Sequence, residues 1–433
     1  MTRGILLRIA VAALSVAGSL VALELGFRWF RWHQLAQIDA PGDAYHFNRR
    51  DPVYHHRYLA NATVRDQRPD YNVAYTLNAV GLRGSSNDGP KPAGTRRLLM
   101  LGDSFTFGIG VDDGKEFPAL LQQAFDGVSL PVDVINAGVG SYSPILHYLT
   151  LRDRYLAWEP DAVVLWIDFG DIHDDAVYER HLLHDEEGRV IACNPDYVDG
   201  RPDWIGALLL RSALMKYLHS KFVRSYEKIR ILGVRSYLWA KIRGEDTKLK
   251  AVHMLGRRRA RVDLVKYDRY LMIRGLATQA ELERYWARTG GYILKIHEML
   301  KERGIPLLLG LYPYGTQVGP AQWHDGRVYF MFEQGVTYDD PLPFDFIKAF
   351  GARHGIPVID THPSFAAAAD EQLFLPLDGH FTDAGHRVVA SHLLRDPVFL
   401  GVVDGLVGRR ARSTALFEPP HASDPPSPVA QSR

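Results

Sequence analysis

The stretch Arg97-Leu98-Leu99-Met100-Leu101-Gly102-Asp103-Ser104-Phe105-Thr106-Phe107-Gly108 decides the fold of this 433-residue chain. Its apolar run, residues 97–101, lies between Gly94-Thr95 and Gly102 and is typical of a buried strand. The chain then turns sharply, and Pro118 marks the start of a helix. A strand, a tight turn, a serine and a helix together place a candidate nucleophile at the carboxyl end of a parallel strand, where open α/β sheets hold their sites.

The alternation of short apolar strands and helices continues along the chain. The expected strands are 97–101, 132–136, 161–167, 306–312 and 357–360. The expected helices are 117–125, 144–158, 282–303, 344–354 and 384–394. Short apolar strands separated by helices indicate a parallel sheet with both faces covered, so the predicted fold class is α/β.

The chain divides into six predicted segments. These are an N-terminal segment (1–32), a strand-rich lead-in (33–96), two parts of the α/β domain (97–175 and 282–408), a basic helical insertion (176–281) and a disordered tail (409–433). The insertion carries Arg257-Arg258-Arg259 and Arg261. We interpret it as a solvated helical surface, or as a face for anionic lipid headgroups or an acidic glycan.

Residues 1–32 predict an N-terminal transmembrane helix that stays attached as an anchor. The uncharged run from Ile9 to Leu23 spans about 22 Å, and a bilayer core is roughly 30 Å thick. The cationic and aromatic stretch Arg28-Trp29-Phe30-Arg31-Trp32 is typical of a membrane surface. The alternative is a cleaved signal peptide, because Ala17-Gly18-Ser19 supplies small residues. We expect a single-pass protein of the cell membrane with an extracytoplasmic (periplasmic) catalytic domain, although the charges do not fix the orientation.

Composition narrows the possible partners. The chain has 51 Lys and Arg against 50 Asp and Glu, so no basic excess points to nucleic acid. Its one cysteine, Cys193, excludes an intrachain disulfide, and zinc-type Cys/His spacing is absent from the sequence. We expect no cofactor.

A serine hydroxyl needs a neighbouring base, an acid that orients the base, and hydrogen-bond donors where negative charge develops on the substrate. The candidate base lies in the loop Leu377-Asp378-Gly379-His380-Phe381, just before the last expected helix. There Asp378 can bind one imidazole nitrogen of His380 while the other faces the serine. His386 falls within the helix and is interpreted as a packing or capping residue.

These motifs, in this order, resemble the SGNH (GDSL-type) hydrolase family, and more narrowly its membrane-anchored bacterial members. The resemblance covers about residues 75–175 and 282–395. It includes a turn ahead of the serine, Asn78-Ala79-Val80-Gly81-Leu82-Arg83. It implies a flavodoxin-like, three-layer α/β/α SGNH hydrolase domain with a parallel sheet, in which Ser104 is the nucleophile, His380 its base and Asp378 the partner of the base.

The resemblance also implies an oxyanion hole around Ser104, Gly140, Ser141 and Gly170. Ser104 and the block Gly140-Ser141 would supply backbone N–H groups, and Ser141 falls where the family usually has glycine. Gly170 stands about where the family has an asparagine, and no asparagine is near. Losing one such donor typically costs about 3 kcal/mol of transition-state stabilisation. An ionised Asp171 cannot replace it, because a carboxylate only accepts hydrogen bonds.

A second departure is the single residue between Asp378 and His380, where most family hydrolases have two. Single-residue spacing resembles relatives that act on acetyl groups of exopolysaccharides. The resemblance therefore implies a membrane-anchored serine esterase or O-acetyl hydrolase acting on an ester or O-acetylated glycan or lipid. An O-acyltransferase using the same serine, or a catalytically weak glycan-binding scaffold, are the alternatives.

Acidic residues crowd the segment after the third expected strand. They are Asp168, Asp171, Asp174 and Asp175, with His173 among them. Clustered carboxylates suit hard cations, but a solvated loop after a strand has the same composition. We favour the loop and predict no metal site.

Overall fold

The computed structural model describes residues 2–30, 47–84, 91–203, 232–245, 277–330 and 332–408, with scattered positions between 212 and 229 and residue 273. The strands are β1 (Asn48–Asp51), β2 (His55–Tyr58), β3 (Ala62–Arg68), β4 (Tyr71–Leu77), β5 (Arg96–Gly102), β6 (Val132–Gly138), β7 (Ala162–Ile167), β8 (Leu182–His184), β9 (Val190–Cys193), β10 (Tyr197–Val198), β11 (Arg201–Pro202), β12 (Leu307–Leu311) and β13 (Val358–Asp360).

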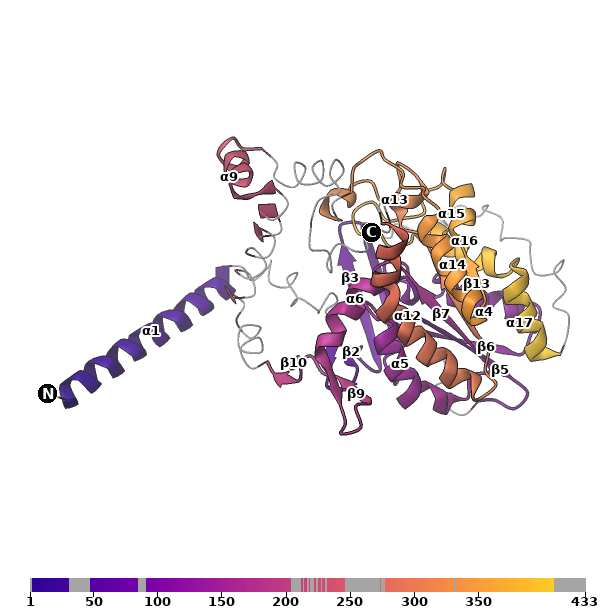
Figure 1. Ribbon diagram of the computed structural model, residues 1–433, viewed down its shortest axis with the longest axis horizontal. Coiled ribbons are helices and arrows are strands. Elements are labelled where there is room, and N and C mark those ends of the chain that lie inside the picture. The colour runs from indigo at the N-terminus through magenta and orange to yellow at the C-terminus, as the bar shows by residue number, and fades with distance from the viewer. Residues whose placement is uncertain are drawn as a thin grey trace, which may run out of the picture.

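The helices flank these strands in sequence and in space (Figure 1). The α-helices are α1 (Thr2–Phe30), α3 (Ser104–Phe107), α4 (Phe117–Gly127), α5 (Pro144–Asp153), α6 (Asp171–Tyr178), α9 (Val234–Ile242), α12 (Gln279–Lys301), α13 (Gly315–Val318), α14 (Leu342–His354), α15 (His362–Ala367), α16 (Asp383–Leu393) and α17 (Pro397–Val407). Short 3-10 turns are η1 (Tyr155–Trp158), η2 (Glu179–His181) and η3 (Arg327–Phe330).

A five-stranded parallel sheet forms the centre, in the order β13-β12-β7-β5-β6. Numbered along the chain, this is the flavodoxin-like order 2-1-3-4-5. Right-handed crossovers then put α4 on one face and α5, α12 and α14 on the other. The contacts agree, since α12 packs on α5, α6 and α14, whereas α4 packs on α16. The α/β prediction is confirmed, and the order of strands reverses between β5 and β7.

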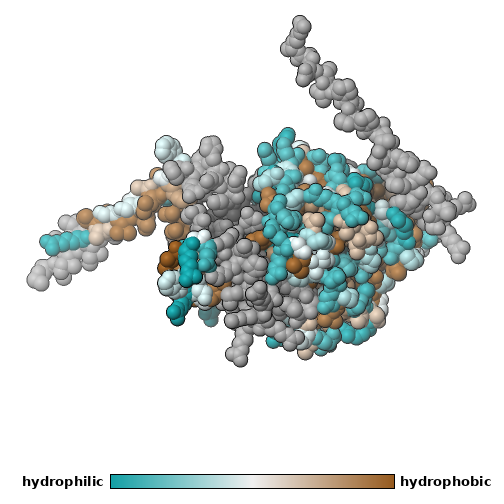
Figure 2. Space-filling view, turned by 90° about the horizontal axis from the view of Figure 1, so that it is seen from above, coloured by the Kyte–Doolittle hydropathy of each residue, from teal (hydrophilic) through white to brown (hydrophobic). Residues whose placement is uncertain are grey.

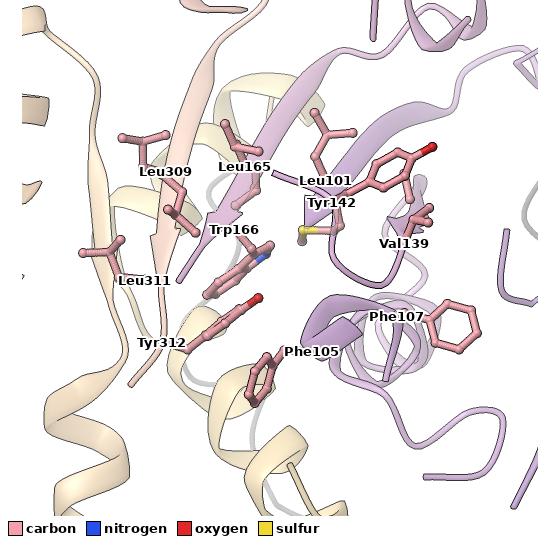
Figure 3. Close-up of a cluster of buried hydrophobic side chains, with 14 of the residues drawn as sticks. Leu101, Phe105, Phe107, Val139, Tyr142, Leu165, Trp166, Leu309, Leu311 and Tyr312 are labelled. Carbon is pink, nitrogen blue, oxygen red and sulfur yellow. The ribbon is translucent and has the colours of Figure 1, made fainter. Parts of the chain in front are cut away.

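The core lies between these layers because the strands are apolar on both faces. Leu98, Leu99, Met100 and Leu101 of β5 are at most 1 % exposed. Figure 3 shows Leu101, Leu165 and Leu309 side by side on neighbouring strands, as the register of the sheet requires. A continuous apolar run is what a strand covered on both sides needs.

The expected strands and helices are observed within a few residues, but the structure also contains helices that were not expected. The segment expected as a solvated loop after the third strand forms α6, with Asp171 and Asp175 buried, and α17 follows the helix expected to be the last. The expected helix 144–158 is divided, because α5 ends at Asp153, the next residue Arg154 leaves the helical conformation (φ −133°, ψ −57°), and the turn η1 follows. The expected helical insertion, 176–281, begins with the end of α6 and the turn η2, and the antiparallel pairs β8–β9 and β10–β11 follow where helix was expected. The cluster Arg257-Arg258-Arg259 and the tail 409–433 lie outside the described residues.

The lead-in forms two antiparallel pairs, β1–β2 and β3–β4, that pack against the start of the α/β domain. Phe107 of α3 lies among the lead-in aromatic rings, 4.7 Å from Tyr58, 5.3 Å from Tyr75 and 5.9 Å from Phe47 between ring centroids. The lead-in therefore supports the short helix that begins with Ser104.

α1 projects away from the α/β domain (Figure 1). Its contacts to other described segments include Glu24, which accepts hydrogen bonds from the Ser212 hydroxyl (2.7 Å) and the Leu214 amide (3.0 Å). Within the described ranges, no helix combines the length and the hydrophobicity needed to cross a membrane. The transmembrane helix expected over residues 1–32 therefore finds no support in the structure.

Candidate active site

Ser104 occupies the sharp turn between β5 and α3. Asp103 caps α3, its carboxylate accepting the Phe105 amide at 2.9 Å, and Gly108 ends the helix in the left-handed conformation. A Cβ at Gly138 would clash with the backbone of Phe107, so this turn lies directly against the end of β6. Ser104 is 8 % exposed. It lies where the strand order reverses, which is the usual ligand site of such sheets.

The structure brings the three predicted catalytic side chains together. Ser104 Oγ lies 2.7 Å from His380 Nε2, and His380 Nδ1 is hydrogen-bonded to Asp378 Oδ1. The ring of Phe105 lies 4.8 Å from the His380 ring between centroids and limits its rotation. This is the geometry in which an imidazole can remove the proton of a serine hydroxyl.

Charges around His380 favour its protonated form. Burial alone lowers the pKa of His380, but the Asp378 carboxylate, with Asp103 and Asp168 behind it, raises the pKa above its ordinary value. Burial likewise opposes ionisation of Asp378, yet the charge and hydrogen bond of His380 hold the pKa of Asp378 below its ordinary value. The pair thus stabilises an imidazolium, the species that forms when serine gives up its proton.

A second aspartate, which the sequence analysis missed, holds the loop of Asp378. Asp70 Oδ2, in the turn between β3 and β4, accepts the Leu377 amide at 2.7 Å and the Asp378 amide at 2.6 Å. Asp70 lies 308 residues away in the chain, so no local motif announces the contact.

The predicted oxyanion-hole residues divide into two groups. The Gly140 N–H donates to the Tyr58 hydroxyl at 2.6 Å, and the Gly170 N–H donates to the Asp168 carboxylate. These two amides are already engaged within the protein. The N–H groups of Ser104 and Ser141 make no hydrogen bond to any residue that the structure describes. An oxyanion role therefore stays a prediction for Ser104 and Ser141.

Buried carboxylates and two tyrosines line the other side of the turn. Tyr312 donates to Asp103, and Tyr314 donates to Asp168 Oδ2 at 2.8 Å. A Cβ at Gly170 would lie 2.7 Å from Asp168 Oδ1 and 2.9 Å from the Tyr314 hydroxyl, so this conformation leaves no room for a side chain there. The sequence signal for the tyrosines was their place at the carboxyl end of the expected strand 306–312, which Tyr312 ends and Tyr314 follows.

Burial controls the ionisation of these acids. It raises the pKa of Asp103 to about 7, with the charge of Asp168 adding to the effect. It also raises the pKa of Asp171 well above its ordinary value. Within the described residues, no cluster of His, Cys, Asp or Glu side chains is arranged to hold a metal ion.

His386, interpreted from the sequence as a packing or capping residue, is fully buried, and its Nδ1 accepts the Phe117 amide at 3.3 Å.

Comparison with known proteins finds similarity only among solved structures. No protein-family model and no curated protein sequence matches the chain. An acetyl xylan esterase, AlAXEase, is 14 % identical at a TM-score of 0.33, covering 69 % of this chain and 97 % of that one. A catalytic mutant of an acetylxylan esterase from Geobacillus stearothermophilus is 13 % identical at a TM-score of 0.33, covering 75 % and 100 %.

A third similar structure is an alpha/beta hydrolase enzyme from the metagenome of Lake Arreo, Spain. It is 14 % identical at a TM-score of 0.31, covering 74 % of this chain and 98 % of that one. Identities and TM-scores this low assign neither a family nor an activity to this chain.

Proposed function

We propose that this protein is a serine esterase of the SGNH type that cleaves ester bonds by acyl transfer through Ser104. The observation that carries the proposal is the hydrogen-bonded series Ser104–His380–Asp378, with 2.7 Å between the serine oxygen and the imidazole. The segments that supply it are far apart in sequence, and the fold brings them to one edge of the sheet.

The proposed reaction begins when Ser104 Oγ attacks the ester carbonyl carbon and its proton passes to His380 Nε2. The carbonyl electron pair becomes an oxyanion, to which we expect the amides of Ser104 and Ser141 to donate hydrogen bonds. Collapse of this intermediate breaks the bond to the alcohol oxygen, which takes the proton from His380. An acyl-serine remains. Water then attacks the acyl carbon while His380 Nε2 takes its proton. Collapse of the second intermediate releases the acid, and the Ser104 oxygen takes the proton back from His380.

We propose O-acetyl groups on glycans as the substrate class. Support comes from the single-residue spacing of Asp378 and His380, which resembles relatives that act on exopolysaccharide acetyl groups. Transfer to a sugar hydroxyl instead of water needs no further catalytic group, because the same acyl-serine serves both. Product analysis with an acetylated oligosaccharide and an unacetylated acceptor separates hydrolysis, which releases acetate, from transfer, which acetylates the acceptor.

Labelling with a fluorophosphonate tests the nucleophile. Ser104→Ala should abolish labelling and turnover of 4-nitrophenyl acetate. Ser364→Ala is a matched control, because Ser364 Oγ also lies 2.8 Å from an imidazole, that of His392, at a separate place in the domain. Labelling that survives Ser104→Ala, or an unlabelled wild-type protein that binds acetylated glycan without turnover, would contradict the esterase and favour the binding scaffold.

We further propose that α1 attaches the domain to a membrane surface, with the domain on the extracytoplasmic side. Most of its described apolar side chains are exposed, among them Leu14 (73 %) and Trp29 (85 %), and Figure 2 shows hydrophobic residues along this projection. In α9, Leu238 (53 %) and Ile242 (75 %) are exposed as well. Protease digestion of intact cells, compared with lysed cells, reports the side on which the domain lies.

A further inference from the structure

The loop that follows β6 is fixed by the lead-in strand β2. Both backbone polar groups of Gly140 are bound: its N–H donates to the Tyr58 hydroxyl at 2.6 Å, and its carbonyl lies 2.8 Å from His56 Nε2. His56 is 3 % exposed and Tyr58 1 %. A further hydrogen bond joins the same two segments, since the Tyr142 hydroxyl donates to the His56 carbonyl at 2.7 Å. No part of the catalytic triad takes part in these bonds.

The geometry of one peptide bond makes this contact relevant to catalysis. The carbonyl of Gly140 and the N–H of Ser141 belong to the same peptide, and none of the described peptide bonds is cis. In a planar trans peptide the N–H points opposite to the carbonyl. A donor that fixes the Gly140 carbonyl therefore also fixes the direction of the Ser141 N–H.

Ser141 itself needs such support. Its φ of +61° lies in the left-handed region, which strains a residue with a side chain. The Tyr178 hydroxyl donates to the Ser141 carbonyl at 2.8 Å, so hydrogen bonds hold the peptides on both sides of this residue. The chain segments of Ser104 and Ser141 leave the sheet side by side, because β5 and β6 end at the paired residues Gly102 and Gly138.

The hydrogen-bond partners determine which imidazole nitrogen carries the proton. A carbonyl only accepts, so His56 Nε2 must be the protonated nitrogen. Burial lowers the pKa of His56 to about 4, so the ring is neutral near pH 7 and its Nδ1 is an acceptor. His55 Nδ1, 3.0 Å away, must then donate. The direction of donation runs from His55 through His56 to the Gly140 carbonyl.

We propose that His56 and Tyr58 are positioning residues that orient the Ser141 N–H toward the oxyanion. His56 fixes the peptide between Gly140 and Ser141 through its carbonyl, and Tyr58 fixes the preceding peptide through the Gly140 N–H. This inference rests on the proposed esterase function. It gives the lead-in a role in rate as well as in folding, and it assigns to an N-terminal strand the orientation of a donor that follows β6.

The first test compares His56→Phe with His56→Gln. Phenylalanine keeps a ring but removes the donor, whereas the glutamine amide can supply an N–H near the position of Nε2. Removing an oxyanion donor costs about 100- to 1000-fold in kcat. Loss of its orientation alone should lower kcat of His56→Phe by about 10- to 100-fold with KM changed less than about threefold. His56→Gln should recover most of the rate.

The second test uses two buried tyrosines of the lead-in. Tyr58 accepts the Gly140 amide, and Tyr75 accepts the Gly110 amide at 3.0 Å. Tyr58→Phe and Tyr75→Phe each remove one such acceptor, and both should lower the melting temperature. Tyr58→Phe should also lower kcat and accelerate hydrogen–deuterium exchange in the peptide covering residues 136–143. Tyr75→Phe should do neither.

The two readouts separate the possible failures. Unchanged exchange at 136–143 in His56→Phe and Tyr58→Phe would overturn the positioning role, and so would unchanged kcat in a variant of the active enzyme. A wild-type protein with no turnover overturns the proposed function, and with it the catalytic consequence. Equal losses of kcat in Tyr58→Phe and Tyr75→Phe would reduce the contact to general stability and would also overturn the proposal.

Discussion

Gly379 accounts for the short spacing between Asp378 and His380. Its φ of +88° folds the chain back on itself, which brings the Asp378 carboxylate to the near nitrogen of the ring two residues later. A Cβ at Gly379 would clash with the Trp323 indole. Conformation and close packing therefore both require glycine here.

Gly379→Ala should accordingly lower both stability and activity. We expect a loss of about 1–2 kcal/mol from the left-handed backbone, more from the clash with Trp323, and a fall in kcat as His380 moves. Gly335→Ala is the control, since Gly335 has φ +72° but nothing within 4 Å of its Cβ position. Thermal unfolding and esterase assays compare the two, and equal behaviour would rule out the packing explanation.

The pH profile reports the state of His380. The imidazole must be neutral to accept the serine proton, and its pKa is raised above the ordinary 6.5. We therefore expect kcat/KM to rise with pH through a midpoint above 6.5. Asp103→Asn removes a charge that favours the imidazolium and should move the midpoint down. Asp383→Asn, which removes an exposed partner of Lys115, should leave it unchanged.

The same pair makes stability depend on pH. Because the pKa of His380 is raised on folding, its contribution is complete below the ordinary histidine pKa and is lost as pH rises through the raised value. Because the pKa of Asp378 is lowered, its contribution is present above the ordinary aspartate pKa and is lost as pH falls through the lowered value. The pair of His380 and Asp378 therefore stabilises the fold most between the ordinary pKa of aspartate and the ordinary pKa of histidine.

Among single residues, the sequence predicted the candidate catalytic side chains but not the residues that hold their loops in place. Ser104, His380 and Asp378 were predictable because each lies in a short motif beside an expected element. Asp70 and His56 were not, since each acts through a backbone group of a distant loop. A contact to a main-chain carbonyl or amide places no demand on the residue type of its partner, so it leaves no pattern in the sequence.

Among the elements, the turn from Asn78 to Arg83 supports the helix of the nucleophile. Asn78 Oδ1 accepts the amides of Val80 and Leu82, which closes the turn. The buried guanidinium of Arg83 donates to the Phe107 carbonyl at 2.9 Å and the Val111 carbonyl at 2.6 Å. The lead-in thereby fixes the segment Phe107–Val111, which follows Ser104 in the chain.

Arg83→Met should be strongly destabilising. Arg83 is fully buried and lies 3.5 Å from the buried Glu116, so removing its charge leaves an uncompensated carboxylate and costs about 3–5 kcal/mol. Arg189→Met removes an ion-paired arginine that is 73 % exposed and should cost less than about 1 kcal/mol. Denaturant unfolding measures the loss of stability in both variants. Similar losses would show that the buried Arg83 stabilises the fold no more than an exposed ion-paired arginine does.

The five sheet strands were predictable because each is a short apolar run bounded by turn residues. The strands β8 and β9 were not predicted, because the helical spacing of apolar residues later in the insertion led us to assign the whole segment 176–281 as helical. Their own signal is the turn between them, where Asp185 accepts the amides of Glu187 and Arg189. Short strands of this kind depend on such a turn more than on any run of apolar residues.

For the whole molecule, attachment to a membrane should depend on the exposed apolar side chains of α1. Leu14→Lys with Val21→Lys places two charges among its exposed apolar residues and should shift the protein from the membrane to the supernatant fraction. Turnover of a soluble ester should not change. Ile191→Lys, at an exposed apolar residue of β9 that is 46 % accessible, is the control and should leave fractionation unaltered. Retention of the double variant in the membrane fraction would contradict attachment through α1.

Ser104 and His380 are separated by 276 residues, with nearly the whole domain between them. During synthesis at about 5–20 residues per second, the hydroxyl leaves the ribosome roughly 14 to 55 seconds before its base. Throughout that interval the nascent chain carries an inert alcohol. Termination before His380 would leave it in the same condition, so the proposed reactivity needs a chain that extends through His380.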